Sequence, residues 1–380
     1  MSRGGFKAFC VDVNGVVGGG SITDVEDVLS QITDGIVGTS QGWGFDSTKT
    51  ASKNNFVNVG TSGRAQFLTH SSGAKLCISM CITGGTTPSF NLNSYANPEI
   101  GPTSMDGILG GGGLSISMIP PNRGDYDITK ITQSDFMPNS ALRLSGFGMS
   151  YANTYCPRCF VERSDMDGKT FRYMIIVRND VILAAGRRLD NYDSCVFFMI
   201  GNFVDCAQEG DSNSYASFNP FCDYNSSSEG DDDLKSFRQS GTSSESIMPK
   251  DYPNAQIYAA DGGLLSYKAT YSDTATTARD SNALVTRNAN LVKSFSSDSR
   301  RFVSFNVMMD PKPNGGISWG VIPYDYYKGV INPEVLCQIY HDTQQMPLSK
   351  GALLDGGNYK HLCNGVIIGW DSSNTVDFWN

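Results

Sequence analysis

The sharpest candidate for chemistry in the sequence is a pair of cysteines, Cys156 and Cys159, separated by a proline and an arginine. Cysteines with this spacing can supply half of a zinc site or a redox dithiol. A zinc ribbon needs a second close pair roughly 15–20 residues further on, but the next cysteines, Cys195 and Cys206, stand singly. A redox pair opens a helix, whereas the residues after Cys159 are typical of a strand. We therefore predict structural thiols and no bound metal or cofactor.

The signatures of common catalytic sites are missing from the sequence. The three histidines, His70, His341 and His361, form no H-E-x-x-H pair, and there is neither a G-x-S-x-G elbow nor a phosphate-binding P-loop. The segment from Asp165 to Gly168 begins like a calcium loop, but the later ligand positions carry unsuitable residues and no closing glutamate. We therefore predict that the protein is not an enzyme and has no catalytic residues.

Charge and composition narrow the class of partner. Among 380 residues, 29 Lys and Arg stand against 38 Asp and Glu, which gives a net charge of −9. A nucleic-acid-binding protein normally carries a basic patch, so nucleic acid is not expected to be the main partner. No segment approaches the about 20 apolar residues of a membrane span, and the N-terminus lacks the apolar core of a secretion signal. Charged residues make up only 18% of the chain, so its surface is mostly neutral and polar.

Two segments carry helix signals. In the first, Thr23 is placed as the N-cap, Glu26 completes a capping box, and apolar residues recur on one face. These apolar residues are Val25, Val28, Leu29, Ile32 and Ile36. In the second, Asn332 and Pro333 are typical of a helix start, and Val335, Leu336 and Ile339 follow at helical spacing.

The rest of the chain is rich in strand signals separated by short turns. A meander of strands is predicted between residues 159 and 206, and its segment Tyr173–Val177 is apolar on consecutive residues. Both faces of that strand must be covered, by another sheet, a helix or another subunit. We predict a mainly β fold of antiparallel sheets, sandwich- or barrel-like, with one or two short helices and long loops. The predicted domains are residues 1–113, residues 114–330 with an acidic Ser-rich loop at 208–246, and residues 331–380.

Aromatic residues are the candidates for an interface. The cluster Trp319, Tyr324, Tyr326 and Tyr327 suits a sugar or protein contact, since tyrosine and tryptophan combine a large apolar area with a polar tip. Packing within the fold explains the same residues equally well. Chain ends are usually polar, so the apolar pair Phe378 and Trp379 predicts docking, either on this chain or on a neighbour.

The stretch from Thr23 to Ile82 resembles structural proteins of tailed-phage virions. The likeness consists of an amphipathic helix, the turn Gly42-Trp43-Gly44-Phe45-Asp46, and short strands joined by turns at Gly63-Arg64 and Gly73-Ala74-Lys75. The resemblance implies a tail, neck or capsid-associated component without catalytic residues.

We therefore expect a structural component of a large assembly, located in the virion and assembled in the host cytoplasm. Its expected partners are copies of itself and other virion proteins. Two alternatives remain open: a carbohydrate- or receptor-binding module that uses the Tyr324–Tyr327 region, and a hydrolase of an unfamiliar type.

Overall fold

The computed structural model describes residues 5–47, 54–59, 63–82, 113–119, 121, 158–161, 170–189, 195–206, 214–220, 253–258, 264–266, 283–293, 302–309, 327–339, 349–362 and 366–379. In these residues strands predominate, and every pair of neighbouring strands is antiparallel. The predicted mainly β, antiparallel fold is confirmed.

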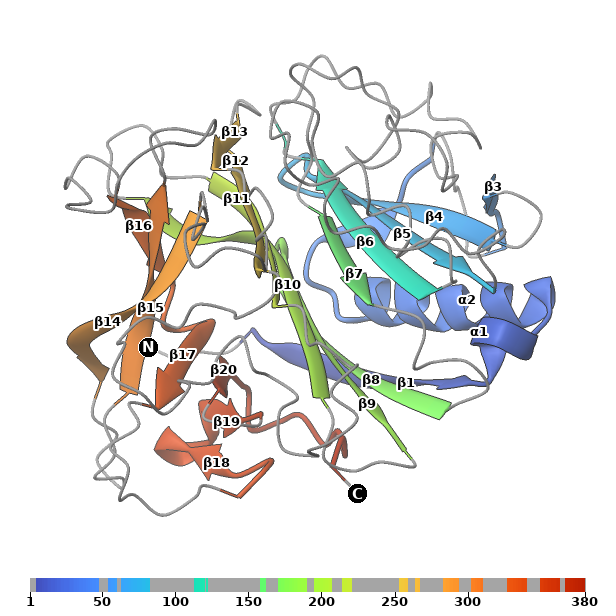
Figure 1. The fold of residues 1–380 in the computed structure, drawn as a ribbon. Helices are drawn as coiled ribbons and strands as arrows, with labels where there is room; N and C mark the ends of the chain where they lie inside the picture. Colours follow the sequence, from blue (N-terminus) through green and yellow to red (C-terminus); the bar gives the residue numbers. More distant parts are fainter. Residues whose placement is uncertain are drawn as a thin grey trace, which may run out of the picture.

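The described strands form two sheets (Figure 1). The larger follows the order β1 (Lys7–Asn14), β8 (Thr170–Arg178), β9 (Val181–Arg188), β10 (Cys195–Cys206), β16 (Tyr327–Ile331), β15 (Phe302–Met309), β17 (Leu336–Ile339), β20 (Val366–Gly369), β19 (Tyr359–His361) and β18 (Leu353–Leu354). Attached to it are β11 (Ser214–Pro220), β12 (Pro253–Tyr258), β13 (Leu264–Ser266) and β14 (Ala283–Lys293). The smaller follows the order β2 (Trp43–Phe45), β4 (Gly63–His70), β5 (Lys75–Cys81), β6 (Gly113–Ile119) and β7 (Arg158–Val161), with β3 (Val57–Val59) beside β4.

The long helix α2 (Ile22–Gly38) forms where the sequence predicts an amphipathic helix. All five apolar residues predicted for its inner face are buried: Val25, Val28, Leu29, Ile32 and Ile36. The cap was predicted wrongly, since Ser21 rather than Thr23 is the N-cap. The Ser21 hydroxyl accepts from the Asp24 N–H at 3.3 Å, and the Asp24 carboxylate accepts from the Ser21 N–H at 2.6 Å. This reciprocal pair satisfies donors that the first turn leaves open. A single helical turn, α1 (Val16–Gly19), precedes it.

Replacing the true cap tests this assignment. We expect Ser21→Ala to lower the free energy of unfolding by about 1 kcal/mol, because an N-terminal N–H loses its acceptor. The matched variant Thr23→Ala, at the position that the sequence favoured, is expected to change it by less than about 0.5 kcal/mol. Urea denaturation of both variants provides the comparison, and a larger loss for Thr23→Ala would contradict the assignment.

The second predicted helix does not form. Asn332 instead organises a turn, in which its side-chain oxygen accepts from the Glu334 N–H at 2.9 Å and its carbonyl accepts from the Val335 N–H at 2.9 Å. The chain then enters strand β17, and Leu336 pairs with Ile368 of β20. A capping residue satisfies a turn as well as a helix, and the pairing with β20 decides between them.

Helix α2 lies between the two sheets (Figure 1). Its apolar residues share one core with the smaller sheet and with one face of β1, β8 and β9. A polar contact crosses this core, since the Thr33 hydroxyl donates to Oε1 of Gln66 in β4 at 2.7 Å. The helix is therefore the middle layer that joins the sheets.

Strand β8 is buried on both faces, as its apolar run predicts. Alternate residues Phe171, Tyr173, Ile175 and Val177 belong to the core shared with α2. Met174 and Ile176, which point to the opposite face, are also buried. On that face Arg187 of β9 lies beneath the ring of Phe378, so the C-terminal segment 371–379 supplies cover there. The cover comes from this chain.

Strand pairing crosses the boundaries predicted for the domains. Strand β1, from residues 1–113, pairs with β8, and β6, which lies in residues 114–330 except for Gly113, pairs with β5 of the N-terminal region. Strands β17, β19 and β20, from residues 331–380, belong to the larger sheet. Of the meander predicted between residues 159 and 206, β8, β9 and β10 are formed, whereas β7 pairs with β6 in the smaller sheet.

Candidate functional site

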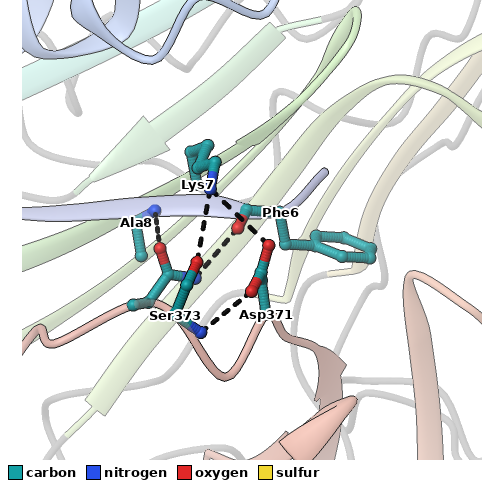
Figure 2. A network of polar contacts seen from close by, with 6 residues as sticks. Phe6, Lys7, Ala8, Asp371 and Ser373 are labelled. Atoms are coloured by element: carbon teal, nitrogen blue, oxygen red, sulfur yellow. Dashed lines mark hydrogen bonds and ion pairs between the residues drawn. The ribbon is translucent and has the colours of Figure 1, made fainter. Parts of the chain in front are cut away.

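The two ends of the described chain meet beside strand β1, in a polar network that Figure 2 shows. The Lys7 ammonium lies 3.6 Å from the Asp371 carboxylate and donates to the Ser373 hydroxyl at 3.3 Å. The Ser373 N–H donates to the same carboxylate at 2.9 Å. Hydrogen bonds from the Ser373 backbone and side chain, and then the charge of Lys7, lower the pKa of Asp371. Because a depressed carboxyl pKa favours the folded state only while the group is ionised, this contribution is lost as the pH falls.

Asn374 covers one end of the outer edge of β1. Its Oδ1 accepts from the Ala8 N–H at 3.1 Å, and its Nδ2 donates to the Phe6 carbonyl at 2.9 Å. The side-chain amide thus satisfies one donor and one acceptor, as a peptide group of a neighbouring strand would. An uncovered edge strand is a template for pairing with another chain, and proteins commonly shield it with a loop.

Removal of this amide should weaken the attachment of the segment. We expect Asn374→Ala to lower the free energy of unfolding by about 1–2 kcal/mol, because two part-buried backbone groups lose their partners. The neighbouring exposed Thr375 gives a matched control, and Thr375→Ala should change it by less than about 0.5 kcal/mol. Equal effects in urea denaturation would mean that the amide does not hold β1.

Phe378 and Trp379 anchor the end of the same segment. The Phe378 side chain is fully buried, and its ring meets the Trp379 ring edge-on at 4.6 Å between centroids. The Arg187 guanidinium lies 5.7 Å from the Phe378 centroid and 6.0 Å from that of Trp379. Gly351, with φ 74°, leaves room for the indole, since a Cβ there would lie 2.5 Å from Cδ1 of Trp379. The apolar end therefore docks on its own chain.

Arg172 of β8 lies between an acid and a base on its two neighbouring strands. It pairs directly with Asp12 of β1 on one side and with Arg187 of β9 on the other. Asp12 accepts two hydrogen bonds from the Arg172 guanidinium, at 2.8 and 3.0 Å. Like charges opposite each other in a sheet repel. The Asp12 carboxylate beside Arg172 and the aromatic rings over Arg187 offset this repulsion between the two arginines.

Cys10, on the same face of β1, is a poor nucleophile. Burial raises the pKa of its thiol to about 11. The thiolate is the reactive form, so at neutral pH Cys10 stays protonated. Its Sγ lies 4.0 Å from the Asp377 carbonyl, which adds one more contact between β1 and the C-terminal segment.

The histidines that the structure describes serve local structure. His70 is the last residue of β4, where Nε2 is 2.9 Å from the Gln41 carbonyl and Nδ1 is 2.8 Å from the Ser72 hydroxyl of the following turn. Its ring also packs against Trp43 at 4.9 Å between centroids. His361 of β19 is buried, with Nδ1 2.9 Å from the Ser349 carbonyl. His341 lies outside the described residues.

The prediction for the other interface residues falls almost wholly outside the described part of the chain. Trp319, Tyr324 and Tyr326 lie outside it, and Tyr327 is the first residue of β16. Of the cysteine pair, Cys156 lies outside it and Cys159 belongs to β7. Sequence reasoning missed Asn374, although Asp371-Ser372-Ser373-Asn374 has the composition of a turn. Its partners Ala8 and Phe6 stand 366 and 368 residues away.

Across the described ranges, no group of three or more His, Cys, Asp or Glu side chains is arranged to hold a metal ion. Over the same ranges, none of the helices combines the length and apolar character that a membrane span requires. The chain matches no protein-family model, and no curated protein aligns with it significantly.

Proposed function

We propose that this protein is a non-enzymatic structural component of a large protein assembly, built from copies of itself and other proteins. The observation that carries the proposal is the tie between β1 and the segment 371–379. Asn374 binds the backbone of Ala8, which lies 366 positions away in the sequence. The ion pair of Lys7 and Asp371 lies beside this contact. An edge strand has a neighbour on one side only, so fastening it with a segment distant in the sequence suits a subunit that must keep its shape under load.

The charged residues support the same function. Arg64 of β4 binds Glu26 of α2 at 2.7 Å, and Arg178 of β8 binds Glu334, beyond β16, at 3.0 Å. Together with Asp12 and Arg172, these ion pairs join different elements of the fold. The ion pairs therefore help to fix the elements relative to one another, as expected of a subunit that bears mechanical load.

The resemblance of the helix, the Gly-Trp turn and the following strands to tailed-phage structural proteins supports a more specific proposal. Within that class, the chain is a tail, neck or capsid-associated protein of a virion. Its low content of charged side chains suits this function, because such a surface is less costly to desolvate in protein contacts.

Copy number in purified particles tests the proposal. We expect quantitative mass spectrometry of gradient-purified virions to find the protein at several copies per particle, and antibody labelling in electron micrographs to place it at one position. Particles that lack the protein, while it stays in the soluble fraction of the same lysate, would show that it is not a virion component.

A further inference from the structure

Among the described residues, the outer edge of β1 has a stretch without a partner strand beside the Asn374 cap; this is the open stretch. In an antiparallel ladder, the N–H and C=O groups of alternate residues point to the same edge. The Ala8 N–H points outward, since it donates to Asn374. The backbone groups of Cys10 and Asp12 therefore point outward too. Strand β1 ends the order of its sheet, and no backbone group in the described ranges pairs with these two residues on that edge.

This stretch is suited to strand addition. All eight residues of β1 pair with β8 without a register shift, so no bulge bends the edge away. The Asp12 side chain is 37% exposed, which leaves this end of the edge accessible. Of the two charged residues of β1, Lys7 lies at the other end and Asp12 is paired with Arg172, although charged side chains often protect such edges.

We propose that β1 is a copy-to-copy interface, in which its outer edge pairs antiparallel with the same edge of a second copy. Val11 lies on the two-fold axis. Cys10 of each copy then faces Asp12 of the other, and the two pairs exchange four backbone hydrogen bonds. This inference rests on the proposed function and deepens it, because it names the contact between copies.

A second copy fits better than an arbitrary strand because the edge is self-complementary, as a two-fold interface requires. On the face toward α2, Val11 meets its own copy and Phe9 meets Val13, so cross-strand neighbours are apolar. The adjacent registers fit less well. With Asp12 on the axis, two carboxylates would face each other. With Cys10 on the axis, pairing would need the Ala8 N–H, which Asn374 already holds.

Proline at position 10 tests the interface. The Cys10 N–H points away from β8, so Cys10→Pro removes an outward donor without breaking the ladder inside the chain, and edge strands accept proline. Cys10→Ala removes the thiol and keeps the donor, which makes it the matched control. In sedimentation-velocity experiments on the full chain, we expect wild type and Cys10→Ala to self-associate and Cys10→Pro to do so at least tenfold more weakly. Self-association of the proline variant at wild-type strength would overturn the proposal, and so would a wild type that stays monomeric at all concentrations.

Amide hydrogen exchange of the wild-type chain tests the same interface if the Cys10→Pro variant fails to fold. In the wild-type chain, the Cys10 and Asp12 amides should become at least tenfold more protected as concentration rises, whereas the Val11 amide, which faces β8, should be protected throughout. Protection of Cys10 and Asp12 that does not depend on concentration would contradict the pairing. The proposed function is judged separately: if the protein is present in particles but these two amides exchange there as in the monomer, the interface proposal fails and the structural function stands.

Discussion

Phe378→Ala is expected to lower the free energy of unfolding by about 3–5 kcal/mol, as for other fully buried phenylalanines. The side chain has no exposed surface, and its ring covers the Arg187 guanidinium. Truncation therefore opens a cavity and removes the aromatic face over a buried cation. Urea denaturation followed by circular dichroism measures the loss.

The control is Leu353→Ala in β18, whose side chain is 55% exposed although it is large and apolar. This change should cost less than about 1 kcal/mol, because little area is withdrawn from water. If Phe378→Ala costs no more than the control, the C-terminal segment is not a fixed part of the fold, and the cover over β9 must come from elsewhere.

Gly201→Ala is expected to cost about 3 kcal/mol or more, because it combines backbone strain with overpacking. Gly201 has φ 131°, a conformation that residues with a Cβ rarely adopt, and it lies in β10 against the turn between β8 and β9. A Cβ there would lie 2.1 Å from the Asp180 carbonyl oxygen and 2.7 Å from the Val181 Cα. Both neighbours are backbone, so the clash cannot be relieved by a side-chain rotation.

Gly44→Ala in β2 is the matched control, since a Cβ there would meet nothing within 4 Å. It should leave stability unchanged or raise it by about 0.5 kcal/mol, because alanine restricts the unfolded chain. Thermal unfolding of the pair measures the difference. A Gly201→Ala melting temperature equal to that of Gly44→Ala would show that β10 does not approach the turn so closely.

Local patterns were sufficient for the elements that depend on nearby residues. The spacing of Val25, Val28 and Leu29 predicted the buried face of α2, because a helix repeats every 3.6 residues whatever it packs against. The cap was harder to predict, since Ser21 and Thr23 both precede an acidic residue at the spacing of a capping box. The order of β8, β9 and β10 could also be predicted, because short connections make consecutive strands neighbours.

Elements whose conformation depends on distant partners could not be predicted from the sequence. The turn at Asn332 is compatible with a helix, and only the pairing of Leu336 with Ile368 makes the next residues a strand. Asn374 has no local feature that indicates its contact with β1. The two sides of that site are brought together by the fold, and no spacing in the sequence records it. For the same reason the predicted boundary at residue 113 did not anticipate that β1 pairs with β8.

The long separation between β1 and its Asn374 cap has a consequence during protein synthesis. The two are 366 residues apart, so at 5–20 residues per second the cap leaves the ribosome roughly 20–70 s after the strand it covers. Throughout that interval a nascent β1 exposes the Ala8 N–H and the Phe6 carbonyl as well as its open stretch. Chains on neighbouring ribosomes of one messenger RNA are then close together with matching uncovered edges. Slow translation should therefore increase aggregation of this protein, and a chaperone that holds β1 until residue 374 emerges should suppress it.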